Sequence, residues 1–253
     1  MQLSVTSPDD DRLNKPAADL AVQEFSAAQA ARWDTFVDGC EDATFFHLAG
    51  WQQVIERAFG HRTHYLFAES GGEIQGVLPL VHIKSRLFGN ALISTPFCVY
   101  GGVASEDAAV RVMLEAAACR LAEELKVDYL ELRNREAYHP DWPTKQLYVT
   151  FRKTIEPDPE ANMLAIPRKQ RAMVRKGIKA GLLGDFDHSI EDFYSAYSQS
   201  VHSLGTPVFS RTYFECLQKV FGKKCDILTV THNGKLVSSV MNFYFRDEVL
   251  PYY

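Results

Sequence analysis

Two stretches of this sequence read as copies of one unit: WQQVIERAFGHRTHYLFAESGGEIQGVLPLV, residues 51–81, and YFECLQKVFGKKCDILTVTHNGKLVSSVMNF, residues 213–243. Their first residues, 51 and 213, lie 162 positions apart, and the two stretches align without a gap. In each copy an aromatic residue opens an amphipathic segment and Phe-Gly closes it. A Gly-Gly or Asn-Gly pair then separates two apolar runs, as a hairpin turn requires. The pattern predicts that helix, strand, tight turn and strand occur twice, so we expect an internal duplication.

The two copies are followed by segments of different length. Residues 82–155 follow the first copy, whereas only residues 244–253 follow the second. The last five residues, VLPYY, resemble Pro96–Tyr100 (PFCVY), which lead into a Gly-Gly pair after the first copy. We therefore expect the chain to be a fragment that stops inside its second domain. The alternative is a naturally short protein whose sheet is completed by a partner chain.

The composition indicates a soluble globular protein. The chain has 253 residues, of which 46% are hydrophobic and 23% charged, and this length accommodates two domains. The N-terminal stretch has no basic segment followed by an apolar core, and no run of eighteen apolar residues follows, so we expect a cytoplasmic location. The five cysteines form no C-x-x-C pair, which argues against a disulfide framework and against a zinc site.

Hydrophobic spacing predicts an alternation of helices and strands. Helices are expected at residues 27–39, 51–59, 107–125 and 190–203, and strands at 65–69, 74–83, 92–95, 127–132 and 148–155. Such alternation favours an α/β fold with a mixed sheet rather than a helical bundle. We divide the chain into a disordered lead at residues 1–20, a first domain at 21–155 and a second domain at 156–253, with a proline-containing linker at 155–162.

A basic helix is expected at the start of the second domain. Residues 166–182 read IPRKQRAMVRKGIKAGL, with six basic residues and no acid, in a chain whose net charge is −5, so the remainder carries −11. Pro167 suits a first helical position. At 100° per residue the cationic side chains gather on one face, and the apolar side chains lie on the other. The cationic residues are Arg168, Lys169, Arg171, Arg175, Lys176 and Lys179, and the apolar residues are Ile166, Met173, Val174 and Ile178.

Three interpretations of this helix are open: an anion-binding surface, a solvated charged face, or a contact with the acidic remainder of the protein. Like charges three or four positions apart cost roughly 1 to 2 kcal/mol in total, and nothing within the helix offsets this cost. The two cations of the first turn also oppose the positive end of the helix dipole. Arginine is suited to bidentate capture of phosphate oxygens. These points favour anion binding over a solvated charged face.

A duplicated α/β unit, joined by a strand and then by a basic R-K-x-R-x-x-x-R-K-x-x-K helix, resembles the FemAB-like proteins, whose halves each have the fold of a GNAT acyltransferase. The resemblance spans residues 40–253. It looks closest to the branch associated with exosortase (PEP-CTERM) and exopolysaccharide systems, and residues 193–214, FYSAYSQSVHSLGTPVFSRTYF, are its most characteristic piece. It implies tandem GNAT-like domains, the second one incomplete.

The resemblance also implies a function. Fem enzymes transfer an amino acid from aminoacyl-tRNA to an amine of a peptidoglycan precursor, and basic residues between their domains hold its phosphates. For this chain it implies an acyl or aminoacyl transferase that acts on an amine of an anionic cell-envelope or exopolysaccharide precursor. Arg168, Arg171 and Arg175 would contact phosphates, with Lys169, Lys176 and Lys179 as secondary candidates. The donor would be acyl-CoA or aminoacyl-tRNA, and no tightly bound cofactor is implied.

One departure from the simple acetyltransferase pattern concerns the donor site. GNAT domains grip the acyl-CoA pyrophosphate with a Q/R-x-x-G-x-G/A loop at a helix N-terminus. The nearest equivalent in the first copy, Tyr100–Ala104 (YGGVA), lacks this motif, and the corresponding loop of the second copy would follow Tyr253. We therefore expect this stretch of chain to be inactive by itself. No catalytic residue is assigned, because acyl transfer to an amine requires no fixed side-chain triad.

Further candidates lie after the basic helix. Tyr194 and Thr206 are candidate substrate-binding residues in a crevice between the two halves, which we also expect the arginines to line. The competing interpretation places the tyrosines in an ordinary core stripe with Phe193, Tyr197 and Val201 at four-residue spacing. A function from another class is also open: a non-catalytic module that binds RNA or an anionic glycan through the same basic helix.

Overall fold

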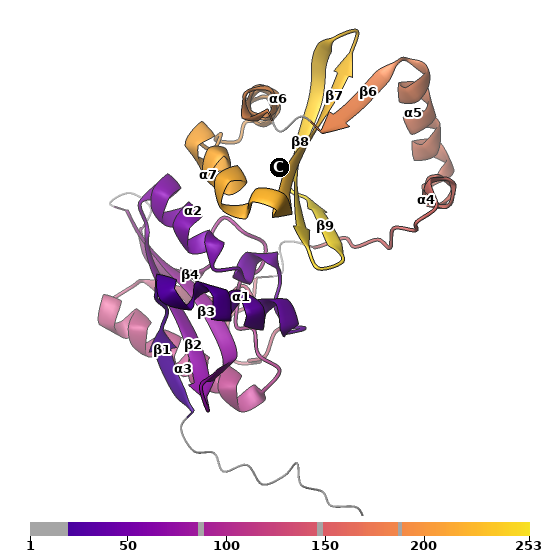
Figure 1. The fold of residues 1–253 in the computed structure, drawn as a ribbon. Helices are drawn as coiled ribbons and strands as arrows, with labels where there is room; N and C mark the ends of the chain where they lie inside the picture. The colour runs from indigo at the N-terminus through magenta and orange to yellow at the C-terminus, as the bar shows by residue number, and fades with distance from the viewer. Residues whose placement is uncertain (1–19, 86–88, 146–148, 187–188) are drawn as a thin grey trace, which may run out of the picture.

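The structure is a computed structural model that describes residues 20–85, 89–145, 149–186 and 189–253 (Figure 1). The predicted lead at residues 1–20 lies outside the described residues except for Leu20. Two β-sheets, each with its own helices, form two halves of the molecule. We call the elements from β1 to β5 the first half and those from α4 to β9 the second half.

The first half is built on a five-stranded mixed sheet with the order β1-β2-β3-β4-β5. Strands β1 to β4 are antiparallel neighbours, and β5 pairs with β4 in parallel. The parallel pair is possible because the helix α3 (Ala108–Leu125) crosses over between its two strands. The strands are β1 (Ala21–Glu24), β2 (Arg62–Ser70), β3 (Glu73–Ser85), β4 (Gly89–Ser94) and β5 (Tyr129–Glu131).

Both faces of this first sheet are covered by helices. Helix α3 packs on one face, over Leu66, Leu78 and Leu80. Helices α1 (Ala30–Gly39) and α2 (Gly50–Phe59) pack on the other, with short 3₁₀ helices at Ala27–Gln29 and Phe45–His47 beside them. Six consecutive residues in the middle of β2 are buried. Since successive residues of a strand point to opposite faces of the sheet, this burial means that both faces are covered. The sheet is therefore the central layer of three.

The second half contains a four-stranded antiparallel sheet with the order β6-β7-β8-β9. Helices α6 and α7 pack on one face of it and bury Phe214, Ile227 and Phe243. The elements are α4 (Pro159–Ala165), α5 (Arg168–Lys179), β6 (Leu182–Phe186), α6 (Ile190–Ser203), α7 (Arg211–Phe221), a 3₁₀ turn (Gly222–Lys224), β7 (Cys225–His232), β8 (Lys235–Phe245) and β9 (Glu248–Pro251).

The duplication is confirmed in the strand register. Thr63 pairs with Val81 in the first sheet, and Cys225 pairs with Phe243 in the second, each residue 162 positions further on. Both hairpins carry a bulge at the equivalent place, after Ala68 and after Val230. Both turns have positive φ at their two central residues, Gly71-Gly72 and Asn233-Gly234, which is the geometry that a two-residue hairpin favours.

The repeated unit is longer than the sequence match. Strand β1 pairs with β2 as β6 pairs with β7: Glu24 lies opposite Leu66, and Phe186, 162 positions after Glu24, lies opposite Leu228. Helix α1, shifted by the same 162 positions, falls within α6. The unit therefore runs β1-α1-α2-β2-β3-β4 in the first half and β6-α6-α7-β7-β8-β9 in the second. Among the described residues, α3 and β5 have no counterpart in the second half.

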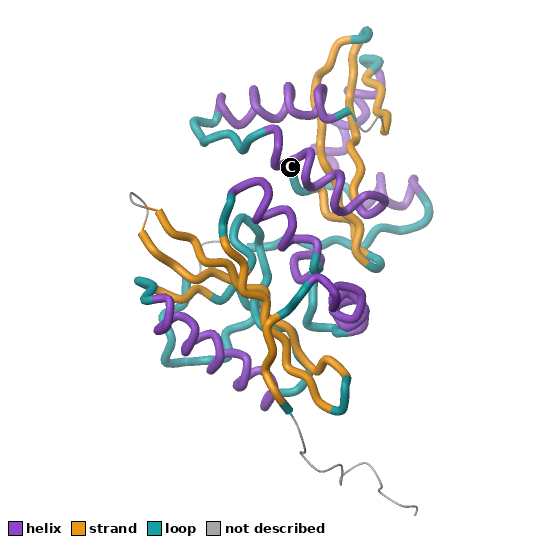
Figure 2. The backbone as a smooth tube through the Cα atoms, turned by 60° about the vertical axis from the view of Figure 1, so that its left-hand side comes forward, coloured by secondary structure: helices purple, strands orange, loops and turns teal. Residues whose placement is uncertain are grey.

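The two halves share one hydrophobic core. Helix α2 lies against α7, and both figures of the backbone show these helices facing each other between the sheets (Figure 1, Figure 2). The Phe45 ring is 4.6 Å from the Phe221 ring and 4.6 Å from the Phe243 ring, measured between centroids. Gly50 allows the helices to approach, because a Cβ there would lie 2.7 Å from Cγ1 of Val220. We call this aromatic contact region the seam.

The predicted helices and most strands are confirmed, but three details differ. No strand occurs at 149–155, where Phe151 is 92% exposed and no neighbouring strand offers hydrogen bonds; residue 148 lies outside the described residues. The predicted linker at 155–162 enters α4 at Pro159. Residues 249–253 do not correspond to Pro96–Tyr100. Leu80 and Asn242 are equivalent, 162 positions apart, and Leu80 pairs with Ser94 whereas Asn242 pairs with Pro251. Pro251 is therefore the equivalent of Ser94.

Candidate functional site

Helices α4 and α5 form a short pair that precedes the second sheet. The Asp158 side chain caps α4 by accepting hydrogen bonds from the backbone N–H groups of Glu160, at 3.0 Å, and Ala161, at 3.3 Å. Helix α5 begins at Arg168, with Pro167 just before it at the N-cap rather than at the first helical position. The Pro167 carbonyl accepts the first helical hydrogen bond, from the N–H of Arg171 at 2.9 Å. Local sequence is sufficient to start both helices.

The six cations of α5 form an unpaired stripe. Five of them line one shallow hollow together with Ala172, namely Arg168, Arg171, Arg175, Lys176 and Lys179. The sixth, Lys169, is the second residue of the helix and is not among the residues that line the hollow. In the described part of the chain, no salt bridge or side-chain hydrogen bond joins any of the six to another residue. No internal partner there offsets the mutual repulsion of these charges. We call this surface the basic stripe.

The position of the basic stripe differs from the sequence-based expectation. All residues that line its hollow belong to α5, and among the described elements α5 has its main contacts with α4 and β6. Figure 1 shows α4 and α5 beyond β6, on the side of the second sheet away from α6 and α7. The stripe therefore does not line a crevice between the halves. The reason is the seam, which fills the contact between the halves with aromatic side chains.

The two candidates outside α5 are not brought to the basic stripe. Tyr194 is half-buried on α6 and packs on Phe214, with 6.1 Å between ring centroids. Its neighbour Tyr197 packs on the same ring at 4.7 Å, which is what the core-stripe interpretation predicts. Thr206 is exposed in the turn after α6, where its N–H donates to the Val201 carbonyl at 3.2 Å. Neither residue contributes to the hollow along α5.

A cluster of hydroxyl and thiol groups that the sequence did not reveal is buried at the seam. The hydroxyls of Tyr213 and Tyr253 lie 2.6 Å apart, and the buried Tyr65 hydroxyl has no hydrogen-bond partner among the residues that the structure describes. Burial raises the pKa of Tyr65, Tyr213 and Tyr253 well above its usual value and also raises that of the Cys98 thiol. These groups stay protonated near neutral pH, so none of them is a ready base or thiolate nucleophile.

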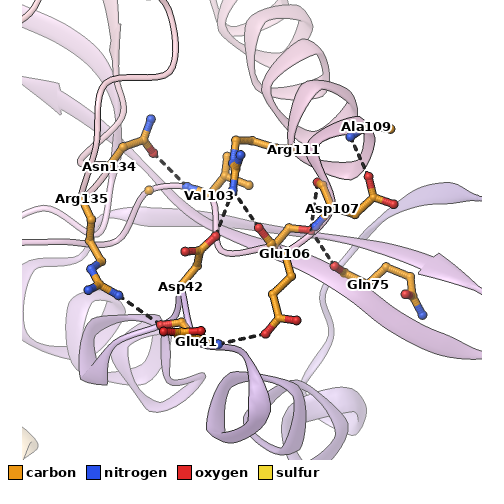
Figure 3. A network of polar contacts seen from close by, with 12 residues as sticks. Glu41, Asp42, Gln75, Val103, Glu106, Asp107, Ala109, Arg111, Asn134 and Arg135 are labelled. Atoms are coloured by element: carbon orange, nitrogen blue, oxygen red, sulfur yellow. Dashed lines mark hydrogen bonds and ion pairs between the residues drawn. The ribbon is translucent and has the colours of Figure 1, made fainter.

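A polar network joins the start of α3 to the loop before the Phe45–His47 turn (Figure 3). Arg111 donates to Asp42 at 2.9 Å and to the Ser105 carbonyl at 2.8 Å, and its guanidinium lies 3.9 Å from the centre of the Tyr138 ring. Glu106 accepts a hydrogen bond from the N–H of Glu41 at 3.2 Å. Most of these groups pair with one another, although the buried Nε of Arg111 has no hydrogen-bond partner among the described residues. We interpret the network as a structural joint.

The loop at Tyr100–Ala104, which the sequence suggested as the nearest equivalent of a GNAT donor loop, is held by internal contacts. Gly102 donates its N–H to the Arg133 carbonyl at 3.1 Å, and the N–H of Val103 donates to the Asn134 side chain at 3.1 Å. His47 binds the Gly102 carbonyl through Nε2 at 3.0 Å. These backbone groups are therefore occupied and cannot cradle a pyrophosphate without rearrangement.

The described residues give no indication of two other kinds of site. No group of three or more His, Cys, Asp or Glu side chains among them is arranged to hold a metal ion. No helix in the described ranges is both long and apolar enough to cross a lipid bilayer. Among the described residues, the basic stripe is therefore the strongest candidate for a ligand-binding surface.

Comparison with known proteins identifies the fold. No protein-family profile and no curated protein sequence matches the chain. Among solved structures, FemX matches 83% of this chain with a TM-score of 0.56 at 14% identity, and the match covers 57% of FemX. Aminoglycoside 6'-N-acetyltransferase AAC(6')-IG from Acinetobacter haemolyticus matches 54% of the chain at 15% identity, covering 99% of that enzyme, with a TM-score of 0.35.

The match to FemX extends over most of the chain. The chain spans a little more than half the length of FemX, 57%. At 14% identity the likeness concerns the fold. This protein therefore has the mixed α/β fold of FemX, with a repeated unit of helices packed on a sheet.

Proposed function

We propose that this protein belongs to an acyl or aminoacyl transferase system and that the basic stripe binds the phosphates of an anionic acceptor. The observation that carries the proposal is the combination of a FemX-type fold with six unpaired cations on one helix. Phosphate oxygens are the chemical partner that clustered arginines bind most effectively, because each guanidinium offers a planar pair of donors. The acceptor class we infer is a phosphorylated precursor of the cell envelope or of an exopolysaccharide, and the donor is acyl-CoA or aminoacyl-tRNA.

The arrangement of the stripe supports this assignment. Arg168, Arg171 and Arg175 follow one another at spacings of three and four residues, so their side chains lie along one line on the helix. The helix has about 1.5 Å rise per residue, which puts neighbouring members of this line about 5 to 6 Å apart, a distance that two linked phosphate groups can bridge. Lys176 and Lys179 extend the same surface toward the end of α5.

The test is a binding titration with the whole chain. The probes are inorganic pyrophosphate and an amine-bearing nucleoside diphosphate sugar, measured by calorimetry at two salt concentrations. The double substitution Arg171→Ala with Arg175→Ala should weaken binding at least about tenfold, since it removes two charge-assisted contacts. Lys235→Ala, at an exposed position of β8, is the matched control and should leave the affinity unchanged. Equal affinity in all three proteins would refute the proposal.

The same titration separates the proposal from a nucleic-acid-binding module. A small diphosphate held by two or three arginines should lose affinity modestly with salt. RNA held by six cations should lose affinity steeply, with a slope of about 0.7 per neutralised phosphate in a plot of log affinity against log salt. Tight, steeply salt-dependent binding of RNA together with no binding of the diphosphate probes would favour the RNA module.

A further inference from the structure

The apolar back of α5 is exposed, as is most of its basic stripe. Met173 is 65% exposed, Ile178 62% and Val174 41%, and none of the side chains of α5 is buried. A helix on a globular protein normally turns its apolar side toward the core. The apolar back of α5 is instead open to solvent.

The exposed apolar surface continues beyond α5. Leu164, at the end of α4, is 61% exposed. Leu182, the first residue of β6, is 36% exposed, and a Cβ on Gly177 would lie 3.1 Å from it, so it borders α5 directly. Strand β6 is an edge strand of its sheet, and no further strand of the described residues pairs with its outer edge. Exposed aliphatic side chains therefore lie on the elements just before and just after α5.

The geometry points to an anionic lipid bilayer as the partner of this surface. We propose that α5, assisted by the end of α4, lies flat in the headgroup region of a membrane that contains anionic lipids. Met173, Val174 and Ile178 would enter the acyl boundary. The six cations would reach up to the lipid phosphates, as long basic side chains do at interfaces. Membrane-surface helices combine these two features: an apolar face and a Lys/Arg-rich polar face.

Charge distribution favours this orientation. The remainder of the chain carries −11, so an anionic surface repels every other side of the molecule on average. That repulsion decays over about 8 Å at physiological ionic strength. Among the described elements, α5 has its main contacts with α4 and β6, so the six cations can approach the surface first. Each Lys or Arg near an anionic leaflet adds attraction.

The two exposed faces together favour a bilayer over a nucleic acid. A nucleic acid would use the cations and leave Met173, Val174 and Ile178 in water. A bilayer uses both faces. At about 1.5 Å per residue, the helix is roughly 18 Å long and thus too short to span the bilayer, which is consistent only with a surface position.

The experiment is cosedimentation of the whole chain with vesicles of phosphatidylcholine alone and of phosphatidylcholine with about one-third phosphatidylglycerol. Wild-type protein should bind the anionic vesicles and bind the neutral ones weakly. Two variants test the two faces: Met173→Ser with Ile178→Ser, and Arg171→Glu with Arg175→Glu. Each should weaken binding to anionic vesicles at least about tenfold. Because these side chains lie outside the core, both variants should keep the wild-type circular dichroism spectrum and melting temperature.

Matched controls and clear contrary outcomes complete the test. Val237→Ser, 55% exposed on β8, and Lys235→Glu should bind vesicles like the wild type. The inference is overturned if the wild type ignores anionic vesicles. It is also overturned if the apolar variant binds them as well as the wild type, since binding would then be purely electrostatic. The apolar variant should retain its affinity for pyrophosphate, so loss of vesicle binding and failure of the proposed phosphate site are separate results.

Discussion

Gly102 is a residue whose lack of a side chain is required by its neighbours. A Cβ at this position would lie 1.9 Å from Oδ1 of Asn134 and 2.8 Å from the Cα of Asn134. The hydrogen bond from the Gly102 N–H to the Arg133 carbonyl holds the two backbone segments together. We expect Gly102→Ala to lower the free energy of unfolding by about 2 to 4 kcal/mol, measured by urea denaturation. Gly39→Ala, where nothing lies within 4 Å, should change it by less than about 1 kcal/mol. Equal effects at both positions would contradict this account.

His47 makes stability depend on pH. Burial lowers its pKa from 6.5 to about 4, and the neutral ring accepts the N–H of Thr44 at Nδ1 and donates from Nε2 to the Gly102 carbonyl. Between about pH 6.5 and 4 the unfolded chain binds a proton that the folded chain excludes, so stability falls as the pH is lowered through this range. The loss should reach about 3 kcal/mol below pH 4.

Urea denaturation at a series of pH values checks the His47 prediction. Carboxylates titrate in the same range, so the comparison is with His47→Gln, which keeps a donor and an acceptor but does not titrate. The variant is expected to be less stable than wild type at pH 7 and to lose less stability between pH 6.5 and 4. Parallel curves for the two proteins would show that His47 does not contribute to the pH dependence.

At the scale of elements, both copies of the repeated unit are marked by the same local sequence signals. Helices α2 and α7 end in Phe-Gly, and the glycines that follow have φ of 68° and 49°, which an L-residue with a side chain rarely adopts. These local signals can be read from sequence because they act within a few residues. The matching of α1 with α6 and of β1 with β6 could not be read, because these segments share no identical residue at the 162-residue spacing.

The basic stripe is also a feature of a single element, the helix α5. Its helix, its amphipathic character and its cations were predicted from residue spacing, and the structure has the helix at Arg168–Lys179. Its position beside β6, away from the seam, was not predicted. Charge spacing along a helix determines which face is cationic. Which neighbour that face meets depends on contacts with the rest of the chain.

At the scale of the whole molecule, Phe45 connects the two halves. Its side chain is 1% exposed and touches Phe221 and Phe243 of the second half. Phe45→Ala should lower the free energy of unfolding by about 3 to 5 kcal/mol, because it leaves a cavity at the seam. Phe151→Ala, at a side chain that is 92% exposed, is the control and should change stability by less than about 0.5 kcal/mol.

The same experiment tests whether the halves unfold together. In wild-type protein the buried thiols of Cys40, in the first half, and Cys225, in the second, should become reactive over the same range of urea concentration, since one core spans both halves. In the Phe45→Ala variant, the Cys40 and Cys225 thiols should become reactive at lower urea concentrations than in the wild type, or at concentrations that differ from each other. If the thiols of wild-type protein are exposed at clearly different urea concentrations, the seam does not couple the halves.

The sequence by itself determined the local features of this protein: the helix-hairpin unit and its repetition, the turns, the helix ends and the cationic face of one helix. These depend on periodicity, glycine and charge within short segments. Only the tertiary structure decided that aromatic side chains from both halves close the seam, that residues 149–155 form no strand, and that the basic stripe faces outward. Such features depend on contacts between residues far apart in the chain, and no local pattern encodes which distant surfaces meet.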